Sequence, residues 1–363
     1  SCNTGEGHNS AAYAIHEALQ GFGEESEIVD ALRFGGEKSS AIVTSSFNSV
    51  IRKVPGAFGF VYKAGDIYSS TRIISPVYFA NALYAKNLLE YIVEGRFNAV
   101  VCTHLFPMEA LTYIRRKYRL GVKCYGVLTD YTCLPFFAET DLDGYFIPHE
   151  ALLSECASKG IPEEKIACTG IPVSQKFIRR LHKTEARNHL VIPEDFRMYM
   201  IMTGGIGCGQ VLDLCNCILD HQGDETVVCA LCGRNGQMKE DIEKRYQNDS
   251  RVHAVVFTEK VNIYMNATDV LLSKPGGITS TEAAVANVPL VHTMAIPGCE
   301  TKNAAFFAER GMSMQAATLE EAARFANILI HDNGMSQKMR AKQRENTDPQ
   351  SAERIAAYVR GGL

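Results

Sequence analysis

The sequence predicts an α/β fold in which parallel strands alternate with helices in two domains. Apolar runs of strand length recur along the chain, and several end in a glycine-rich turn that opens a helix, as in a parallel sheet. The chain has 363 residues, and single hydrophobic cores rarely grow beyond about 250–300 residues. Hydrophobic residues make up 46% of it and charged residues 21%, which is typical of globular proteins.

Composition narrows the classes of function. The formal net charge is −4, so no overall basicity points to a nucleic-acid partner. We find no signal-peptide pattern and no apolar run near the roughly 20 residues of a membrane-spanning helix. Twelve cysteines are scattered along the chain. Cys229 and Cys232 have CxxC spacing, shortly after Cys215 and Cys217, so a zinc or redox site is an alternative. Their apolar surroundings favour small buried thiols in a reducing cytosol.

The chain opens on a glycine-rich turn, Thr4 to Ser10, which contains His8. We expect a helix from Ala11 to Leu19 and a strand from Ser26 to Ala31. A glycine loop before a helix can hold an anion at the helix N-terminus, although such a short pattern is more often a plain turn. An apolar strand normally precedes such a loop, so we expect several residues to be missing before Ser1.

Two strands of the first half end in polar pairs. The strand Ala99–Cys102 leads into Thr103-His104, and the strand Lys123–Leu128 leads into Thr129-Asp130. Carboxyl ends of parallel strands meet at one edge of a sheet, so Asp130 should border a cleft, whereas His104 alone is more often a core histidine. The other predicted elements of this half are helices at Pro107–Tyr118 and Glu150–Lys159 and strands at Tyr145–Ile147 and Ile166–Cys168. The DxD pattern at Asp141–Asp143 is interpreted as solvated.

The second half repeats the alternation around a denser glycine loop. Thr203 to Gly209 contains four glycines in six positions, directly after the strand Phe196–Met202. Glycine lets bare backbone N–H groups approach phosphate oxygens, so the loop indicates a phosphate cradle. Further strands are predicted at Thr226–Leu231, Val252–Phe257, Val270–Leu272 and Pro289–His292, with helices ending near Leu219 and at Val261–Ala267, Leu319–His331 and Ser351–Val359.

The segment from Ser273 to Ala305 carries the richest pattern. A buried strand ends in Gly276 and Gly277, and we expect the next helix to open at Thr279 or Ser280, whose hydroxyl would cap it. Glu282 would then lie in the positive first turn. The exit of the following strand carries Glu300 and Asn303. An ordinary βαβ unit with a glycine turn is the alternative interpretation of the same pattern.

A basic and aromatic stretch runs from Arg33 to Lys86. It holds seven basic and two acidic residues, a local net charge of 7 − 2 = +5, interleaved with aromatic and aliphatic side chains. This pattern suits an anionic membrane surface. A pair of ordinary helices with solvated lysines is the alternative.

Two motifs carry a family resemblance. The sequence KPGGITSTEA at 274–283, followed by PGCETKNAA at 297–305, resembles the donor-sugar half of family 28 glycosyltransferases. The chain looks most like monogalactosyldiacylglycerol synthases and the processive diacylglycerol glucosyltransferases of bacteria. It is more distantly similar to the transferase that adds N-acetylglucosamine to the peptidoglycan lipid precursor. Thr4–His8 also resembles the TGxGH signature of the diacylglycerol enzymes, and Gly170–Val173 the hinge between their domains.

The resemblance implies a GT-B fold, two Rossmann-like domains facing one another across a cleft. The expected acceptor domain covers residues 1–170, with its first strand missing, and the expected UDP-sugar domain covers 171–345. Residues 346–363 should form a helix that crosses back to the first domain. The implied activity is inverting transfer of a hexose from a UDP-sugar to diacylglycerol or a glycosyl-diacylglycerol, with no metal or other cofactor. We expect a bacterial cytoplasmic protein, peripheral on the anionic inner face of the cell membrane.

The resemblance also assigns roles to residues. His8 would be the base that takes the acceptor proton, and Asp130 would orient it or be the base itself. Glu282 would accept the ribose hydroxyls, Glu300 and Asn303 would read the hexose, and the backbone of Phe257 and Thr258 would bracket uracil. The other expected donor-site residues are Gly204, Gly205, Gly207, Gly209, Gly233, Arg234, Asn235, Lys274, Gly276, Gly277 and Thr279. Gly5, Gly7 and His104 are expected to face the acceptor or a phosphate.

The chain departs from the family pattern at two points. Cys299 stands where the motif usually has glutamine, and a thiol cannot make the paired hydrogen bonds of an amide, so the sugar stays open. Leu134–Phe137 replaces the His–Trp pair of the plant enzymes, which favours a bacterial enzyme. The alternatives are a UDP-sugar 2-epimerase, a transferase for another lipid such as a peptidoglycan precursor, and a non-enzymatic lipid-bound sensor with a retained nucleotide pocket.

Overall fold

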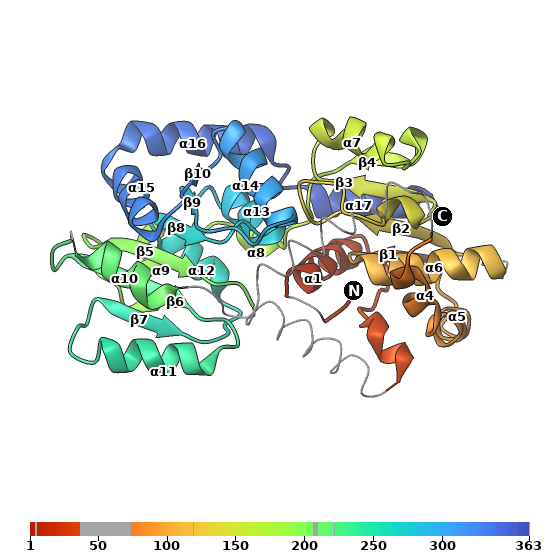
Figure 1. The fold of residues 1–363 in the computed structure, drawn as a ribbon, viewed down its shortest axis with the longest axis horizontal. Coiled ribbons are helices and arrows are strands. Elements are labelled where there is room, and N and C mark those ends of the chain that lie inside the picture. The colour runs from red at the N-terminus through yellow and green to blue at the C-terminus, as the bar shows by residue number, and fades with distance from the viewer. Residues whose placement is uncertain (4–5, 37–73, 119, 206–209, 221, 363) are drawn as a thin grey trace. The chain divides into compact units, whose positions relative to one another are not determined.

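The computed structural model describes residues 1–3, 6–36, 74–118, 120–205, 210–220 and 222–362. The chain forms two compact units (Figure 1). The first comprises Ser1–Ser174, Pro297–Cys299 and Asp348–Leu363, and the second comprises Gln175–Ile296 and Glu300–Thr347. The division after Ser174 falls four residues beyond the boundary expected from the sequence, and the C-terminal segment is part of the first unit. Among the described residues, no helix is long and apolar enough to cross a membrane.

The first unit is built on a four-stranded parallel sheet in the order β1-β2-β3-β4. The strands are β1 (Ala99–Cys102), β2 (Lys123–Val127), β3 (Gly144–Ile147) and β4 (Ile166–Cys168). The helices of this unit are α1 (Glu6–Gly21), η1 (Ala31–Gly35), α4 (Pro76–Ala82), α5 (Ala85–Glu94), α6 (Leu105–Lys117), η2 (Phe137–Glu139), η3 (Glu150–Leu152), α7 (Leu153–Ser158), η4 (Glu163–Lys165) and α17 (Ser351–Gly361).

Helices cover both faces of this sheet, because side chains alternate along each strand. On one face, Cys124 and Tyr145 lie in a core with residues of α5 and α6. On the other, Tyr125 and Phe146 pack with residues of α1 and α17. These two helices lie side by side although they come from opposite ends of the chain (Figure 1).

Three expectations for the first unit are wrong in detail. Helix α1 begins at Glu6 and not at Ala11, so His8 lies in its first turn and not in a loop. Residues 24–30 form no strand. Among the described residues, Ser1 pairs with this segment in the parallel manner, since it donates to Val29 O at 3.1 Å and accepts from Ala31 N at 2.9 Å. One such pair of bonds does not make a strand.

The third error concerns Asp143. Its carboxylate is ion-paired with Arg115 and accepts a hydrogen bond from Cys124 N at 2.8 Å. It therefore fixes the start of β2 and is not simply solvated.

The second unit holds a six-stranded parallel sheet in the order β10-β9-β8-β5-β6-β7. The strands are β5 (Arg197–Met202), β6 (Thr226–Leu231), β7 (Val252–Val255), β8 (Val270–Ser273), β9 (Leu290–His292) and β10 (Met314–Gln315). The helices are α8 (Gln175–Ile178), α9 (Lys183–Leu190), α10 (Val211–Leu219), α11 (Gly236–Arg245), α12 (Val261–Ala267), α13 (Gly277–Val285), α14 (Cys299–Glu309), α15 (Leu319–His331) and α16 (Asn333–Asn346).

The strand order of this sheet reverses between β5 and β8. The chain runs outward from β5 through β6 to β7, then returns to β8 on the other side of β5 and continues through β9 to β10. In the β5–β8 pair, Met202 lies opposite Ser273, so the segments that leave these two strands start side by side. Open α/β sheets bind their ligands at such a switch point.

Arg187 of α9 anchors the N-terminal side of this sheet. Its side chain is 1% exposed and forms an ion pair with Asp269 at 2.8 Å. It also donates to Ala267 O at 3.1 Å, and Asp269 accepts from Met198 N at 2.8 Å. Paired in this way, the buried charge ties α9 to the start of β5 and β8.

Candidate functional site

The polar residues that follow β1 and β2 gather around His8 of α1. The Thr103 hydroxyl donates to His8 O at 2.9 Å, and the Thr103 carbonyl lies 2.7 Å from His8 Nδ1. Thr129 Oγ1 lies 3.1 Å from the same nitrogen. Both threonines are buried. The first turn of α1 is therefore fastened to the exits of two neighbouring parallel strands.

These contacts set the tautomer of His8. A carbonyl oxygen only accepts hydrogen bonds, so Nδ1 must carry the proton that it donates to Thr103 O. The neutral ring then has its lone pair on Nε2. Thr103 and Thr129 had no role in the sequence-based assignment, although they stand in the Thr-His and Thr-Asp pairs that follow the two strands.

The surroundings of His8 lower its pKa from the usual value. Burial is the largest cause, since the charged imidazolium loses its solvation, while the charge of Asp130 opposes the shift. His8 is thus neutral under conditions where an exposed histidine would already be partly protonated. Neutral imidazole with an unprotonated Nε2 has the form of a general base.

His104 is placed beside His8 but has a clear structural duty. The two rings are in edge contact, with centroids 4.5 Å apart, and burial followed by the charge of His8 lowers the pKa of His104 well below its usual value. Its Nδ1 accepts from Phe106 N at 3.1 Å and so caps α6. Asp130 is half-buried at the exit of β2.

In the second unit, the segments after β5, β6 and β8 converge. A Cβ atom on Gly233 would lie 2.4 Å from Gly204 O, and one on Gly204 would lie 2.8 Å from the Cε atom of Lys274. Arg234 N donates to Gly205 O at 3.0 Å. Gly204 and Gly233 both have positive φ, so their positions favour glycine for its backbone conformation as well as for space. The expected donor residues Gly204, Gly205, Gly233 and Lys274 are thus brought together at the switch point.

The start of α13 differs from the sequence-based expectation. The helix begins at Gly277 with Gly276 at its N-cap position, and no side chain caps it within the described part of the chain. Thr279 therefore lies inside the first turn, and the Ser280 hydroxyl bonds His292 Nε2 at 2.9 Å instead of capping. An uncapped helix start presents backbone N–H groups and the positive end of the helix dipole, the arrangement that binds anions.

Glu282 lies in the second turn of α13, not in the first as expected. Only 7% of it is exposed. Burial raises the pKa of its carboxyl to about 8, against a smaller opposing effect of the Lys176 charge. Such a carboxyl is costly to keep unless a ligand uses it. Sequence reasoning did not find Lys176, because it lies in α8, about 100 residues earlier in the chain.

Glu300 and Asn303 lie in the first half of α14 and are both buried. The Glu300 carboxylate forms an ion pair with Lys274 through Oε1 and accepts from Ile296 N at 2.9 Å through Oε2. Asn303 Nδ2 donates to Pro275 O at 3.0 Å. Helix α14 is thereby tied to the segment between β8 and α13, so both expected sugar-reading residues border the same switch point.

The remaining donor candidates lie beyond β6 and β7. The Arg234 guanidinium stacks on the ring of Phe257, 5.1 Å from its centroid, and Phe257 is 48% exposed. Asn235 caps α11 by accepting from Met238 N at 3.1 Å. Thr258 Oγ1 accepts from Lys260 N at 3.1 Å in the turn before α12. Gly7 lies in the first turn of α1, whereas Gly5, Gly207 and Gly209 lie outside the described residues.

The described residues can also be compared with the geometry of a metal site. Across the described ranges, no group of three or more histidine, cysteine, aspartate or glutamate side chains is placed to hold an ion. Cys229 and Cys232 are buried, and burial raises their thiol pKa values to about 12 and about 11. Thiols in this state are poor metal ligands and poor nucleophiles.

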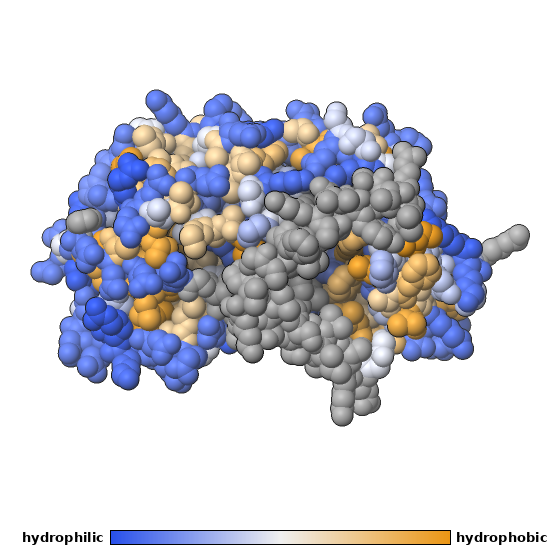
Figure 2. All heavy atoms as spheres, in the orientation of Figure 1, coloured by the Kyte–Doolittle hydropathy of each residue, from blue (hydrophilic) through white to orange (hydrophobic). Residues whose placement is uncertain are grey.

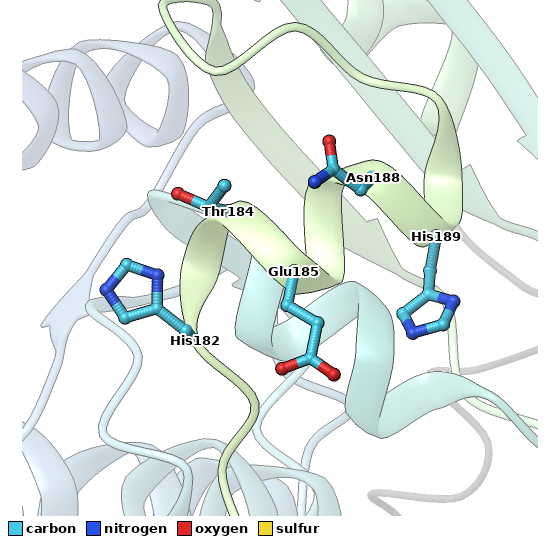
Figure 3. A pocket seen from close by; sticks show the side chains of 5 residues that line it. All are labelled: His182, Thr184, Glu185, Asn188 and His189. Atoms are coloured by element: carbon cyan, nitrogen blue, oxygen red, sulfur yellow. The ribbon is translucent and has the colours of Figure 1, made fainter.

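A shallow surface depression on α9 is unrelated to either candidate site. It is lined by His182, Thr184, Glu185, Asn188 and His189, and Figure 3 shows the Glu185 carboxylate between the two imidazole rings on one side of the helix. Both rings and the carboxylate are exposed, and none of the residues expected to act in the site lines it.

Comparison with solved structures establishes the fold class. The MurG structure from Acinetobacter baumannii covers 78% of this chain and 79% of its own, with a TM-score of 0.54 and 16% identity. The structure of the UDP-GlcNAc 2-epimerase from Neisseria meningitidis bound to UDP-GlcNAc covers 80% of this chain and 84% of its own, with a TM-score of 0.60 and 14% identity. The chain therefore has the predicted GT-B fold.

Sequence relatives define the class of enzyme. Residues 8–173 match the family model for monogalactosyldiacylglycerol (MGDG) synthase. A processive diacylglycerol β-glucosyltransferase of Bacillus mycoides is 25% identical over 83% of this chain and 76% of its own length. The enzyme of that name from Bacillus licheniformis is 25% identical over 93% of this chain and 87% of its own length. The predicted resemblance is confirmed, and the chain is a glycosyltransferase related to these enzymes.

The raised pKa of Glu282 predicts a pH-dependent cost in stability. Because the folded pKa lies above the unfolded one, the folded state holds the extra proton between about pH 4.5 and 8. The contribution of Glu282 to the stability of the folded state is therefore fully present below this pH window and is lost as the pH rises through it. We expect Glu282→Gln to raise the free energy of unfolding at pH 8 by on the order of 1–3 kcal/mol, and by little at pH 5.

Urea unfolding of both proteins at the two pH values measures this difference. Glu243→Gln, at an exposed ion pair on α11, is the charge-matched control and should change stability by only a few tenths of a kcal/mol. Equal stability of wild type and Glu282→Gln at pH 8 contradicts the prediction.

Proposed function

We propose that this protein is an inverting glycosyltransferase that moves a hexose from a UDP-sugar to diacylglycerol or a glycosyl-diacylglycerol at a membrane surface. The observation that carries the proposal is the set of groups at the switch point of the second unit. A glycine turn, the Lys274 ammonium and two buried polar side chains of α14 adjoin one another there, and the uncapped α13, which carries the buried Glu282, starts from the same segment.

This set suits a nucleotide diphosphate-sugar. The N–H groups of α13 and the backbone at Gly204 and Gly205 offer donors to phosphate oxygens, and their positive field stabilises charge on a leaving diphosphate without a metal. Glu282 has the acceptor oxygens that ribose hydroxyls need, and Glu300 and Asn303 have those that a hexose needs. The relatives' names specify a diacylglycerol acceptor and a glucosyl or galactosyl group, which supports the assignment of substrates.

The chemistry of transfer needs a base on the acceptor side. In the step that we propose, the acceptor hydroxyl oxygen forms a bond with the anomeric carbon while the bond from that carbon to the UDP oxygen breaks. UDP leaves with the electron pair, and His8 Nε2 takes the hydroxyl proton. Attack from the face opposite the leaving group inverts the anomeric centre.

A basic and apolar face in the first unit supports the membrane part of the proposal. Phe79 of α4 and Leu83, its C-cap residue one turn further on, are 58% and 87% exposed. Arg116, exposed at the end of α6, lies over the ring of Tyr78, 5.4 Å from its centroid. Figure 2 shows apolar surface where Figure 1 places α4.

Apolar side chains that insert into a bilayer beside cations that attract anionic lipid are typical of peripheral membrane proteins. This face combines residues 78–83 of the basic and aromatic stretch from Arg33 to Lys86 with the end of α6. Most of that stretch, residues 37–73, lies outside the described residues. We propose attachment to the cytoplasmic face of a bacterial membrane on this basis.

A direct assay tests the function. Purified protein is incubated with vesicles of anionic lipid and diacylglycerol, separately with UDP-glucose, UDP-galactose and UDP-N-acetylglucosamine, and lipid products are identified by mass. We expect a hexosyl-diacylglycerol from one of the first two donors, with activity retained in a chelator. Conversion of UDP-N-acetylglucosamine to its 2-epimer without lipid product would favour the epimerase. UDP binding with no product from any donor would favour the lipid-bound sensor with a retained nucleotide pocket.

The role of His8 predicts a selective loss of turnover. His8→Ala should reduce kcat by about 10²–10⁴-fold, the usual contribution of general base catalysis, while UDP affinity stays unchanged because UDP is assigned to the other unit. The lowered pKa of His8 also predicts that wild-type kcat/KM keeps its value below pH 6.5 and falls only at more acidic pH.

His16→Ala is the matched control, since His16 lies on the same helix and bonds Ser26 Oγ at 2.7 Å; it should leave turnover within a few-fold. If His8→Ala keeps near-normal turnover while Asp130→Asn abolishes it, the base is Asp130 and His8 only positions the substrate.

The membrane face predicts two separable effects. Phe79→Ser with Leu83→Ser should weaken binding to every vesicle type, because burial of apolar area is lost. Arg116→Gln with Lys117→Gln should weaken binding only to anionic vesicles, by about 1 kcal/mol per charge at low salt. Vesicle sedimentation measures both, with the exposed Val191 of the second unit changed to Asn as control. Equal binding of wild type to neutral and anionic vesicles would exclude the electrostatic part.

A further inference from the structure

The ion pair between Lys274 and Glu300 occupies two groups that the donor substrate needs. Lys274 is the first residue after β8, and its side chain lies against the β5 turn: a Cβ atom on Gly204 would be 2.8 Å from its Cε atom and 3.8 Å from its Nζ atom. The ammonium is thus held next to the backbone assigned to the diphosphate. In the structure its charge is directed to Glu300.

Glu300 is equally engaged. Its side chain is 9% exposed, and its two carboxylate oxygens bind the Lys274 ammonium and the Ile296 N–H group. A sugar hydroxyl that donates to Oε1 must share that oxygen with the ammonium. Because the charge of a hydrogen-bonded carboxylate is partly satisfied, each added hydroxyl donor weakens the hold on Lys274.

We propose that Lys274 exchanges partners when the donor binds, leaving Glu300 as the hexose hydroxyls engage that carboxylate and moving onto the diphosphate. The proposal rests on the function proposed above and extends it. It assigns Glu300 a second task, because recognition of the hexose releases the cation that stabilises the leaving group. A nucleoside diphosphate without a sugar must break the ion pair with no compensation at Glu300.

This exchange lets the site select among sugars in two ways. The hexose contacts Glu300 directly, and the same contact controls whether Lys274 reaches the diphosphate. A donor whose hydroxyls reach Glu300 gains the Lys274 charge on its diphosphate, where negative charge develops during transfer. A donor whose hydroxyls miss Glu300 leaves Lys274 paired with it. The hexose therefore affects turnover through Lys274 as well as affinity through Glu300.

Titration calorimetry with UDP alone tests the proposal. Glu300→Gln should bind UDP about fivefold or more tightly than wild type, the size of a typical coupling between ligand groups, because Lys274 is no longer held by a carboxylate. Lys274→Met should lose little UDP affinity in the wild-type background and at least fivefold in the Glu300→Gln background. Turnover should fall in both single variants.

Controls separate this result from general charge effects. Glu309→Gln removes a negative charge, as Glu300→Gln does, at an exposed position near the end of α14. Lys260→Met removes a positive charge, as Lys274→Met does, at the exposed residue before α12. Neither control should alter UDP affinity. Urea unfolding verifies that each variant is folded. For a variant that does not fold, Glu300→Asp, which shortens the carboxylate and keeps its charge, replaces Glu300→Gln and should likewise tighten UDP binding.

The outcomes distinguish the two proposals. Tighter UDP binding in Glu300→Gln that depends on Lys274 supports the exchange. Unchanged or weaker binding in folded Glu300→Gln, or additive effects of the two substitutions, overturns the exchange and leaves the glycosyltransferase assignment intact. Failure of wild type to bind UDP at all would instead overturn the proposed function.

Discussion

The donor-side geometry depends on the parallel pairing of β5 with β8. Because Met202 lies opposite Ser273, the glycine turn after one strand and the lysine after the other leave the sheet at the same level. The lysine then lies against the turn, and α13 starts from the same edge. A shift of the pairing by one residue would turn alternate side chains to the opposite face and separate these groups.

The second unit buries two glutamates, Glu300 and Glu282, and they differ in how the cost of burying a carboxylate is offset. Burial penalises a carboxylate, and Glu300 offsets the penalty with an ammonium and a backbone N–H. Glu282 remains largely uncompensated, so its pKa rises. Unfavourable electrostatics of this kind are expected where a structure keeps polar groups for a ligand rather than for stability.

The sequence predicted β1 to β9 because each is an apolar run with a turn residue at its end, but the strand expected at Ser26–Ala31 does not form and the short β10 was not predicted. The predicted strand ends at Met202 and Leu272 agree with the ends of β5 and β8 to within one residue, and the polar pairs at 103–104 and 129–130 do meet. Pattern alone could not find the start of α13, because a glycine N-cap leaves no side-chain signal. Nor could it show that Thr103 and Thr129 hold His8 or that Lys176 influences Glu282, since those contacts join distant segments and exist only once the sheets have formed.

The hydrogen bond that fixes the His8 ring has its acceptor in the main chain. Every residue type at position 103 carries that carbonyl, so replacing the Thr103 side chain removes the return bond to His8 O but not the group that places the proton on Nδ1. An alanine scan would consequently score position 103 as minor. The tautomer is thus protected against mutation, and only a change in the path of the backbone at the end of β1 would release it.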